Sequence, residues 1–78
     1  MQLTVRAIWD ADAKVWVAES ESVPGLVTEA DTIEALTTKL RYMIPELLLL
    51  NNLISADYSG AIKLELSTVR QELIQVGQ

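Results

Sequence analysis

The 78-residue chain is long enough for one small domain, and it contains neither cysteine nor histidine. A disulfide framework, a thiolate metal site, a Cys or Ser-His nucleophile and a histidine pH switch are therefore all excluded. The net charge of −5 argues against binding to nucleic acid, because that affinity comes largely from clustered Lys and Arg.

Size and charge also set expectations about partners. A domain this short gains little net stability from its own core, so we expect a homo-oligomer. An acidic surface suits a small basic protein partner, although such surfaces are more often a device for solubility. The first residues lack a signal peptide, and the most apolar stretch, residues 44–54, is too short to span a bilayer. We therefore expect a cytoplasmic protein without membrane contact.

Alternating side chains predict a hairpin at the start of the chain. Residues 2–9 form the first predicted strand, a polar turn follows at residues 10–13, and residues 14–19 are rich in β-branched and aromatic side chains. The apolar face of the first strand contains four side chains: Leu3, Val5, Ala7 and Trp9.

The register of this hairpin stays open. A four-residue loop is expected to set Trp16 opposite Ala7, whereas a five-residue bulged loop sets it opposite Ile8 and turns it to the other face. One of Trp9 and Trp16 then lies on the outer face of the sheet. Both tryptophans fit core or sheet-covering positions, and the alternative is a partner contact, which is typical of exposed indoles.

A turn and a helix start follow. In Val23-Pro24-Gly25, proline fixes φ and glycine accepts a positive φ, and a short strand over residues 26–29 comes next. Asp31 and Glu34 have capping-box spacing, with Asp31 as the oxygen acceptor and Glu34 reaching back. This pattern predicts a helix from Thr32 to about Leu50.

The predicted helix has one apolar stripe that faces the sheet, and Asn51 ends it as a left-handed residue. Pro45 removes a backbone donor inside the helix, so we expect a bend over residues 41–45. The stripe contains six side chains: Ile33, Leu36, Leu40, Met43, Ile44 and Leu47.

A second, narrower apolar strip lies on the back of this helix. It contains Tyr42, Pro45 and Leu49, next to Thr38. Single exposed apolar residues are common on monomers, so scatter is one interpretation. The alternative is an interface with a subunit or a partner.

The last third of the chain predicts a loop over residues 52–60 and a strand over residues 61–66, with Ile62, Leu64 and Leu66 inward. The same phase returns at Ile74 and Val76, so we expect one long strand that reaches the terminus, with a short helix from Ser67 as the less favoured alternative. The result is a single α+β domain over residues 1–78, in which one helix packs on a mostly antiparallel four-stranded sheet in the order β-β-β-α-β.

Enzymatic chemistry finds no support in the residues. The first strand contains no carboxylate between Gln2 and Trp9, and the three glycines form no phosphate-binding loop. The remaining acids fit a turn, a helix cap or solvent-facing positions, so we expect no metal, no cofactor and no enzyme. These acids are Asp10, Asp12, Glu34, Glu46 and Glu65.

Three segments carry a resemblance to a known family. Trp16-Val17-Ala18, then Val23-Pro24-Gly25-Leu26, then residues 30–36 (Ala-Asp-Thr-Ile-Glu-Ala-Leu) resemble the HicB-like family, the antitoxin side of HicA/HicB toxin–antitoxin systems. The likeness is closest to a short, uncharacterised subgroup with an Arg-x-Met-Ile-Pro-Glu-Leu segment, here residues 41–47. It covers residues 3–50 well and the last strand loosely.

This resemblance implies a truncated RNase H-like fold with sheet order 3-2-1-4 and no catalytic acids. Family members bind and block a small basic RNase toxin, and many add a DNA-binding tail, for which these 78 residues leave no room. Two hypotheses follow: a non-enzymatic, antitoxin-like protein-binding module, or a self-associating structural domain without a toxin. The candidate partner-binding residues are Trp9, Trp16, Tyr42, Pro45 and Leu49.

Overall fold

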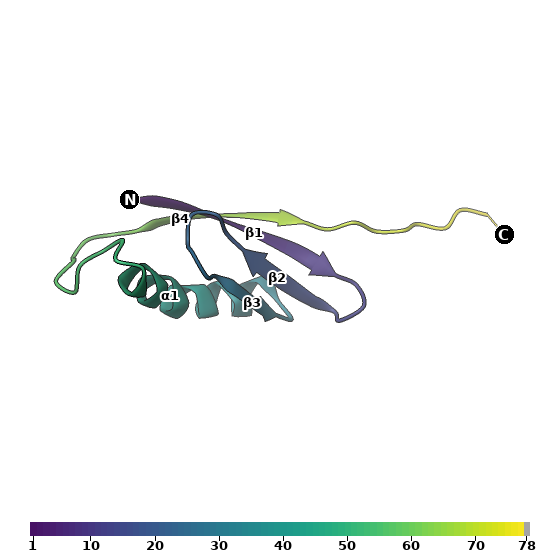
Figure 1. Ribbon diagram of the computed structural model, residues 1–78. Helices are drawn as coiled ribbons and strands as arrows, with labels where there is room; N and C mark the ends of the chain where they lie inside the picture. The colour runs from purple at the N-terminus through teal and green to yellow at the C-terminus, as the bar shows by residue number, and fades with distance from the viewer. Residues whose placement is uncertain (78) are drawn as a thin grey trace.

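The computed structural model describes residues 1–77, which fold into four strands and one helix (Figure 1). The strands form a mixed sheet in the order β3-β2-β1-β4, in which β4 is parallel to β1 and the other neighbours are antiparallel. The α+β class, the element order and the sheet order are therefore confirmed. The elements are β1 (Gln2–Asp10), β2 (Val15–Glu19), β3 (Val27–Ala30), α1 (Ile33–Leu50) and β4 (Lys63–Val69).

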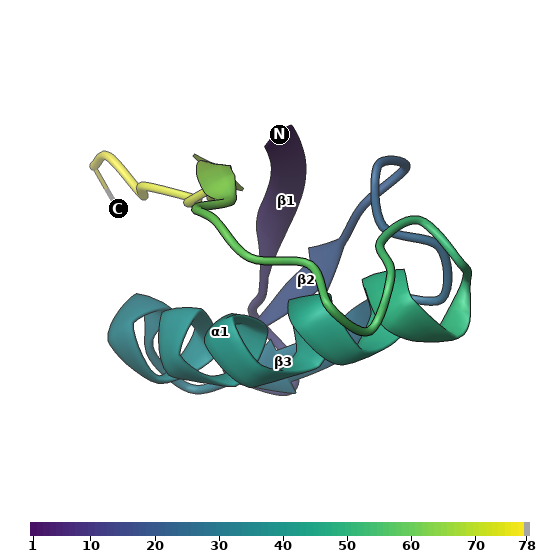
Figure 2. The same ribbon diagram turned by 90° about the vertical axis from the view of Figure 1, so that its left-hand side faces the viewer.

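The core lies between α1 and one face of the sheet. In Figure 2, α1 runs below β2 and in front of β3, and β4 is seen nearly end-on and away from the helix. The predicted stripe of α1 is largely confirmed, with Leu48 added as a fully buried member. Residues three and four apart share one helix face, and residues two apart share one sheet face, so both elements bury a continuous surface. The buried side chains here are Leu36, Leu40, Ile44 and Leu48 from α1, and Leu3, Val5, Ala7 and Ala18 from the sheet.

Both hairpin registers predicted from the sequence are wrong. The structure pairs Asp10 with Val15 across a four-residue loop, so Trp16 lies opposite Trp9 and on the same face. The loop is closed by Lys14, whose N–H donates to the Asp10 carbonyl at 2.7 Å and whose φ is 57°. Neither tryptophan therefore lies on the outer face of the sheet.

The helix ends at Leu50 as predicted, but its N-cap and the left-handed residue after it each lie one position later than predicted. Thr32, not Asp31, is the N-cap, and its hydroxyl accepts the Ala35 N–H at 3.0 Å. Asn51 caps the C-terminus with φ −94°, and Asn52 is the left-handed residue with φ 57°. Leu53 N–H then donates to Leu48 O and Asn52 N–H to Leu49 O, which is the Schellman arrangement. The helix is continuous through Pro45, and the expected bend stays a prediction.

The Pro-Gly turn is confirmed, and it anchors the loop before β3. Gly25 has φ 81°, and the Leu26 N–H donates to the Val23 carbonyl at 3.2 Å. Val23 and Leu26 are buried on either side of the turn. The Asn51 amide donates to the Pro24 carbonyl, so the turn is also tied to the end of α1.

The last strand is shorter than predicted. β4 ends at Val69, and residues 70–77 continue as an extended segment without strand pairing, so a strand reaching the terminus is wrong for these residues, while Gln78 lies outside the described range. The parallel pairing stops at Ile8 and Val69, and β1 itself ends two residues later at Asp10, so it offers no partner to most of this segment. The segment projects beyond the rest of the fold (Figure 1), and the radius of gyration is 15.2 Å. A compact 78-residue domain has a radius of about 11.5 Å.

Replacing Leu40 by alanine should destabilise the domain by about 2–5 kcal/mol, because it removes a fully buried side chain and leaves a cavity. Urea unfolding followed by circular dichroism measures the free energy of unfolding. The matched control is Leu50→Ala on the same helix, where the side chain is 77% exposed, and a change beyond about 0.5 kcal/mol there would contradict this assignment.

Replacing Thr32 by alanine should cost about 1 kcal/mol, because the Ala35 N–H loses its acceptor. Asp31→Ala, at the neighbouring position, should cost clearly less. Thermal unfolding of the two variants side by side tests the cap, and equal losses would mean that both side chains share this role.

Candidate functional site

The outer face of the sheet is an exposed, partly apolar surface. In Figures 1 and 2, α1 lies on one side of the sheet, and no other element of residues 1–77 covers the opposite side. The strand registers place Ile8 between Val17 and Val69 on this side, with Val15 and Val27 nearby. An apolar row thus crosses three adjacent strands.

Charged side chains surround this row. By the same registers, the outer face of the four strands contains four acids and two bases. Its local charge is therefore negative, in keeping with the charge of the whole chain. The acids are Asp10, Glu19, Glu29 and Glu65, and the bases are Arg6 and Lys63.

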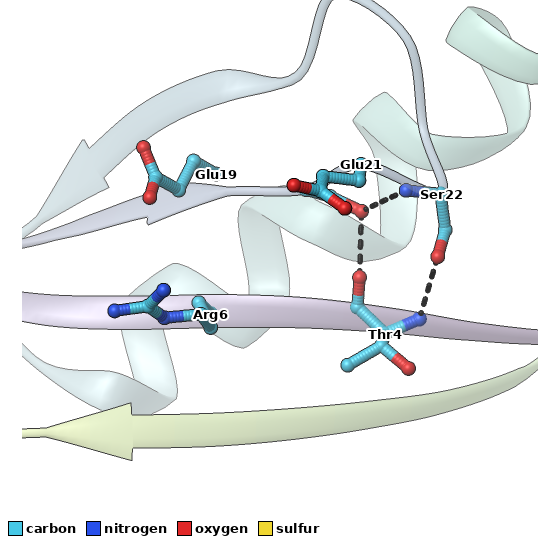
Figure 3. Close-up of a pocket in the computed structure, with 6 residues that line it drawn as sticks. Thr4, Arg6, Glu19, Glu21 and Ser22 are labelled. Atoms are coloured by element: carbon cyan, nitrogen blue, oxygen red, sulfur yellow. Dashed lines mark hydrogen bonds between the residues drawn. The ribbon is translucent and has the colours of Figure 1, made fainter.

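A hollow of about 480 Å³ lies at the end of this face where β2 leaves β1 (Figure 3). The Ser20 hydroxyl donates to the Thr4 carbonyl at 2.6 Å and accepts the Ser22 and Val23 N–H groups, while the Ser22 hydroxyl accepts the Thr4 N–H. Serine side chains thus replace strand pairing beyond Glu19. The hollow is lined by Thr4, Arg6, Glu19, Ser20, Glu21 and Ser22.

The two tryptophans form a cluster on the helix side of the sheet. Their ring centroids lie 5.3 Å apart with the planes tilted by 59°. The Arg70 guanidinium carbon lies 4.4 Å from the centre of a Trp9 ring, and its Nε donates to Glu72 at 2.6 Å. Both indoles are half-buried, so their role as partner contacts stays a prediction.

The predicted strip on α1 is at the surface. Tyr42 is 74% exposed, and Pro45 and Leu49 are also exposed. Pro45 and Arg41 line one wall of an apolar groove of about 290 Å³ between α1 and β4, and Ile62 and Leu64 line the other. The five candidate residues thus fall into two groups on different elements, an aromatic pair on the hairpin and three residues on the helix.

Three features were missed from the sequence. The exposed outer face of the sheet could have been inferred from the sequence. The odd-numbered residues of β1 form the core, so its even-numbered residues must face the opposite side. The contact between Arg70 and Trp9 has no local signal, because it depends on the pairing of distant strands. The exposure of the apolar side chains in residues 70–77 is also unexpected, because their alternation predicts a paired strand.

Two kinds of feature were searched for in residues 1–77, a group of side chains that could hold a metal ion and a helix that could cross a membrane. Within residues 1–77, no group of three or more acidic side chains is placed to hold a metal ion. No helix in that range is both long and apolar enough to cross a membrane.

Two comparisons with known proteins give a match to this chain. The model of a domain of unknown function, DUF1902, matches residues 2–76. The crystal structure of hypothetical protein TTHA1013 from the extremely thermophilic bacterium Thermus thermophilus is similar, with 43% sequence identity and a TM-score of 0.73 over 95% of this chain and 100% of that chain. Comparison with curated proteins gave no match. The likeness to HicB stays a prediction.

Replacing Arg70 by alanine should make Trp9 more accessible, because the guanidinium covers one face of its ring. In a Trp16→Phe background Trp9 is the remaining tryptophan, and we expect red-shifted emission and stronger acrylamide quenching. Lys63→Ala, on the outer face of β4, is the control. Unchanged Trp9 emission after loss of Arg70 would contradict the contact.

Proposed function

Because the chain belongs to the DUF1902 family, whose model matches nearly its whole length, we propose that it is a non-enzymatic protein-binding module. Its target in this proposal is a small basic protein, which it contacts through the outer face of the sheet. The HicB-like residues described above suggest the more specific role of an antitoxin that covers a small basic RNase.

The outer face carries this proposal. Its row of Ile8, Val17 and Val69 supplies apolar area, and acids outnumber bases around that row. Protein interfaces combine an apolar centre with a polar rim, and complementary charge steers association and selects the partner. A basic protein therefore fits this face better than an acidic one.

The residue inventory supports binding over catalysis. The chain has no histidine or cysteine to act as nucleophile or general base. The hollow beside the outer face has Arg6 and two glutamates in its lining, but its serine hydroxyls are already engaged with backbone groups of β1 and the following loop. These serines complete the fold where strand pairing stops.

Affinity capture from an extract of the source cells at low salt, followed by calorimetry with the purified protein that is retained, tests the proposal. We expect a small basic protein whose affinity falls as salt is added, because screening weakens attraction between exposed charges. Retention of no basic protein would contradict the proposal.

The double variant Glu29→Lys/Glu65→Lys reverses two charges on the outer face and should weaken that complex at least tenfold. The matched control, Glu46→Lys/Asp57→Lys, makes the same charge change on α1 and in the loop after it. Equal weakening by both variants would indicate attraction to the net charge instead of recognition by this face.

A further inference from the structure

The free edge of β3 is the edge of the sheet that lies beside α1 (Figure 1). Here the side chain of Lys39 leaves α1, and its Nζ donates to the Glu29 carbonyl of β3 at 2.5 Å. An open strand edge is a template for pairing with another chain, and lysine is one of the residues by which proteins prevent such pairing. We propose that Lys39 is an edge-capping residue, which occupies a backbone acceptor of β3 and keeps the sheet from accepting a further strand there.

The hydrogen-bond pattern of the other strands identifies the free backbone groups of β3. The Lys63 N–H donates to the Met1 carbonyl at 2.9 Å, so the odd-numbered residues of β1 direct their backbone groups toward β4. The even-numbered residues of β1 therefore face β2, in agreement with the bonds that join the Thr4 backbone to Ser20 and Ser22. It follows that the odd-numbered residues of β2 bond to β1 and its even-numbered residues bond to β3.

Two residues of β3 are left facing outward. Ala18 and Thr28 form a hydrogen-bonded pair between β2 and β3 in this pattern. Backbone groups alternate along a strand, so the N–H and carbonyl groups of Val27 and Glu29 point to the free edge. The ammonium group of Lys39 thus lies on one of the two carbonyls that this edge presents.

The cap removes half of the hydrogen bonds that this edge offers to a second copy of the chain. With Thr28 on a two-fold axis, Val27 of each copy would face Glu29 of the other in an antiparallel pair. Two of the four hydrogen bonds in that pair need a Glu29 carbonyl as acceptor. In each copy this carbonyl is already bonded to Lys39.

The surroundings of β3 explain the need for such a cap. Val27 is 72% exposed, and it lies on the outer face near the apolar row of Ile8, Val17 and Val69. A β-branched side chain favours strand pairing, and an edge beside an apolar face is prone to aggregation. The strand is also only four residues long, which limits pairing further.

Lys39→Met tests the cap, because it removes the donor and the charge but keeps most of the length of an exposed side chain. In sedimentation velocity at about 100 μM, we expect this variant to associate about tenfold more tightly than the unchanged chain, because the Glu29 carbonyl is free to pair. Lys39→Arg retains a donor, and Lys14→Met makes the same charge change in the hairpin loop, so both should behave like the unchanged chain. No added association of Lys39→Met, or equal association of either control, would overturn the proposal.

Amide hydrogen exchange locates the gained contact. In Lys39→Met, the N–H groups of Val27 and Glu29 should become about tenfold better protected as the concentration is raised, because they pair with a second strand. Adding Val27→Pro removes one outward-facing N–H at an edge, where proline is tolerated, and should reverse the gained association. Association of the double variant as strong as that of Lys39→Met, or no new protection of these two amides, would overturn the assignment to β3.

Discussion

The packing of one helical stripe against one face of the sheet is the constraint on which the rest of the structure depends. Leu36, Leu40, Ile44 and Leu48 repeat at helical spacing and bury the odd-numbered side chains of β1. The 18-residue helix is also the crossover from β3 to β4, which lie at opposite edges of the sheet. Because α1 packs against β2 and β3, it leaves the outer face and the β4 edge exposed within the described chain. The face proposed for partner binding is one that this packing leaves open.

The elements of the fold were predictable because burial on one face leaves a local periodic pattern. The alternation in residues 2–9 and the helical spacing from Ile33 onward need no knowledge of distant contacts. The N-cap and the left-handed residue after the helix were displaced by one residue for an equally local reason. Asp31 and Thr32 are both good caps, as Asn51 and Asn52 are both good left-handed residues, and only the backbone geometry decides between the members of each pair.

Register and site were less accessible to sequence reasoning. The hairpin register was wrong because pairing Asp10 with Val15 sets Trp16 against Trp9, a match that neither predicted loop allowed. The end of β4 was wrong because the alternating pattern continues past Val69 although the pairing with β1 stops at that residue. The position of Arg70 over Trp9 follows from the parallel pairing of β1 with β4, which no local pattern encodes.

The parallel pairing of the first and last strands also has a consequence for the order of folding. Val5 and Leu66 are neighbours in the sheet although most of the chain lies between them, whereas β1 and β2 meet across a short turn. Closing the long loop costs more chain entropy than closing the hairpin, and contacts of high sequence separation slow folding. We therefore expect the hairpin and α1 to assemble first and β4 to dock last. In the native protein, the amide protons of β4 should then exchange with solvent earlier than those at the centre of β1.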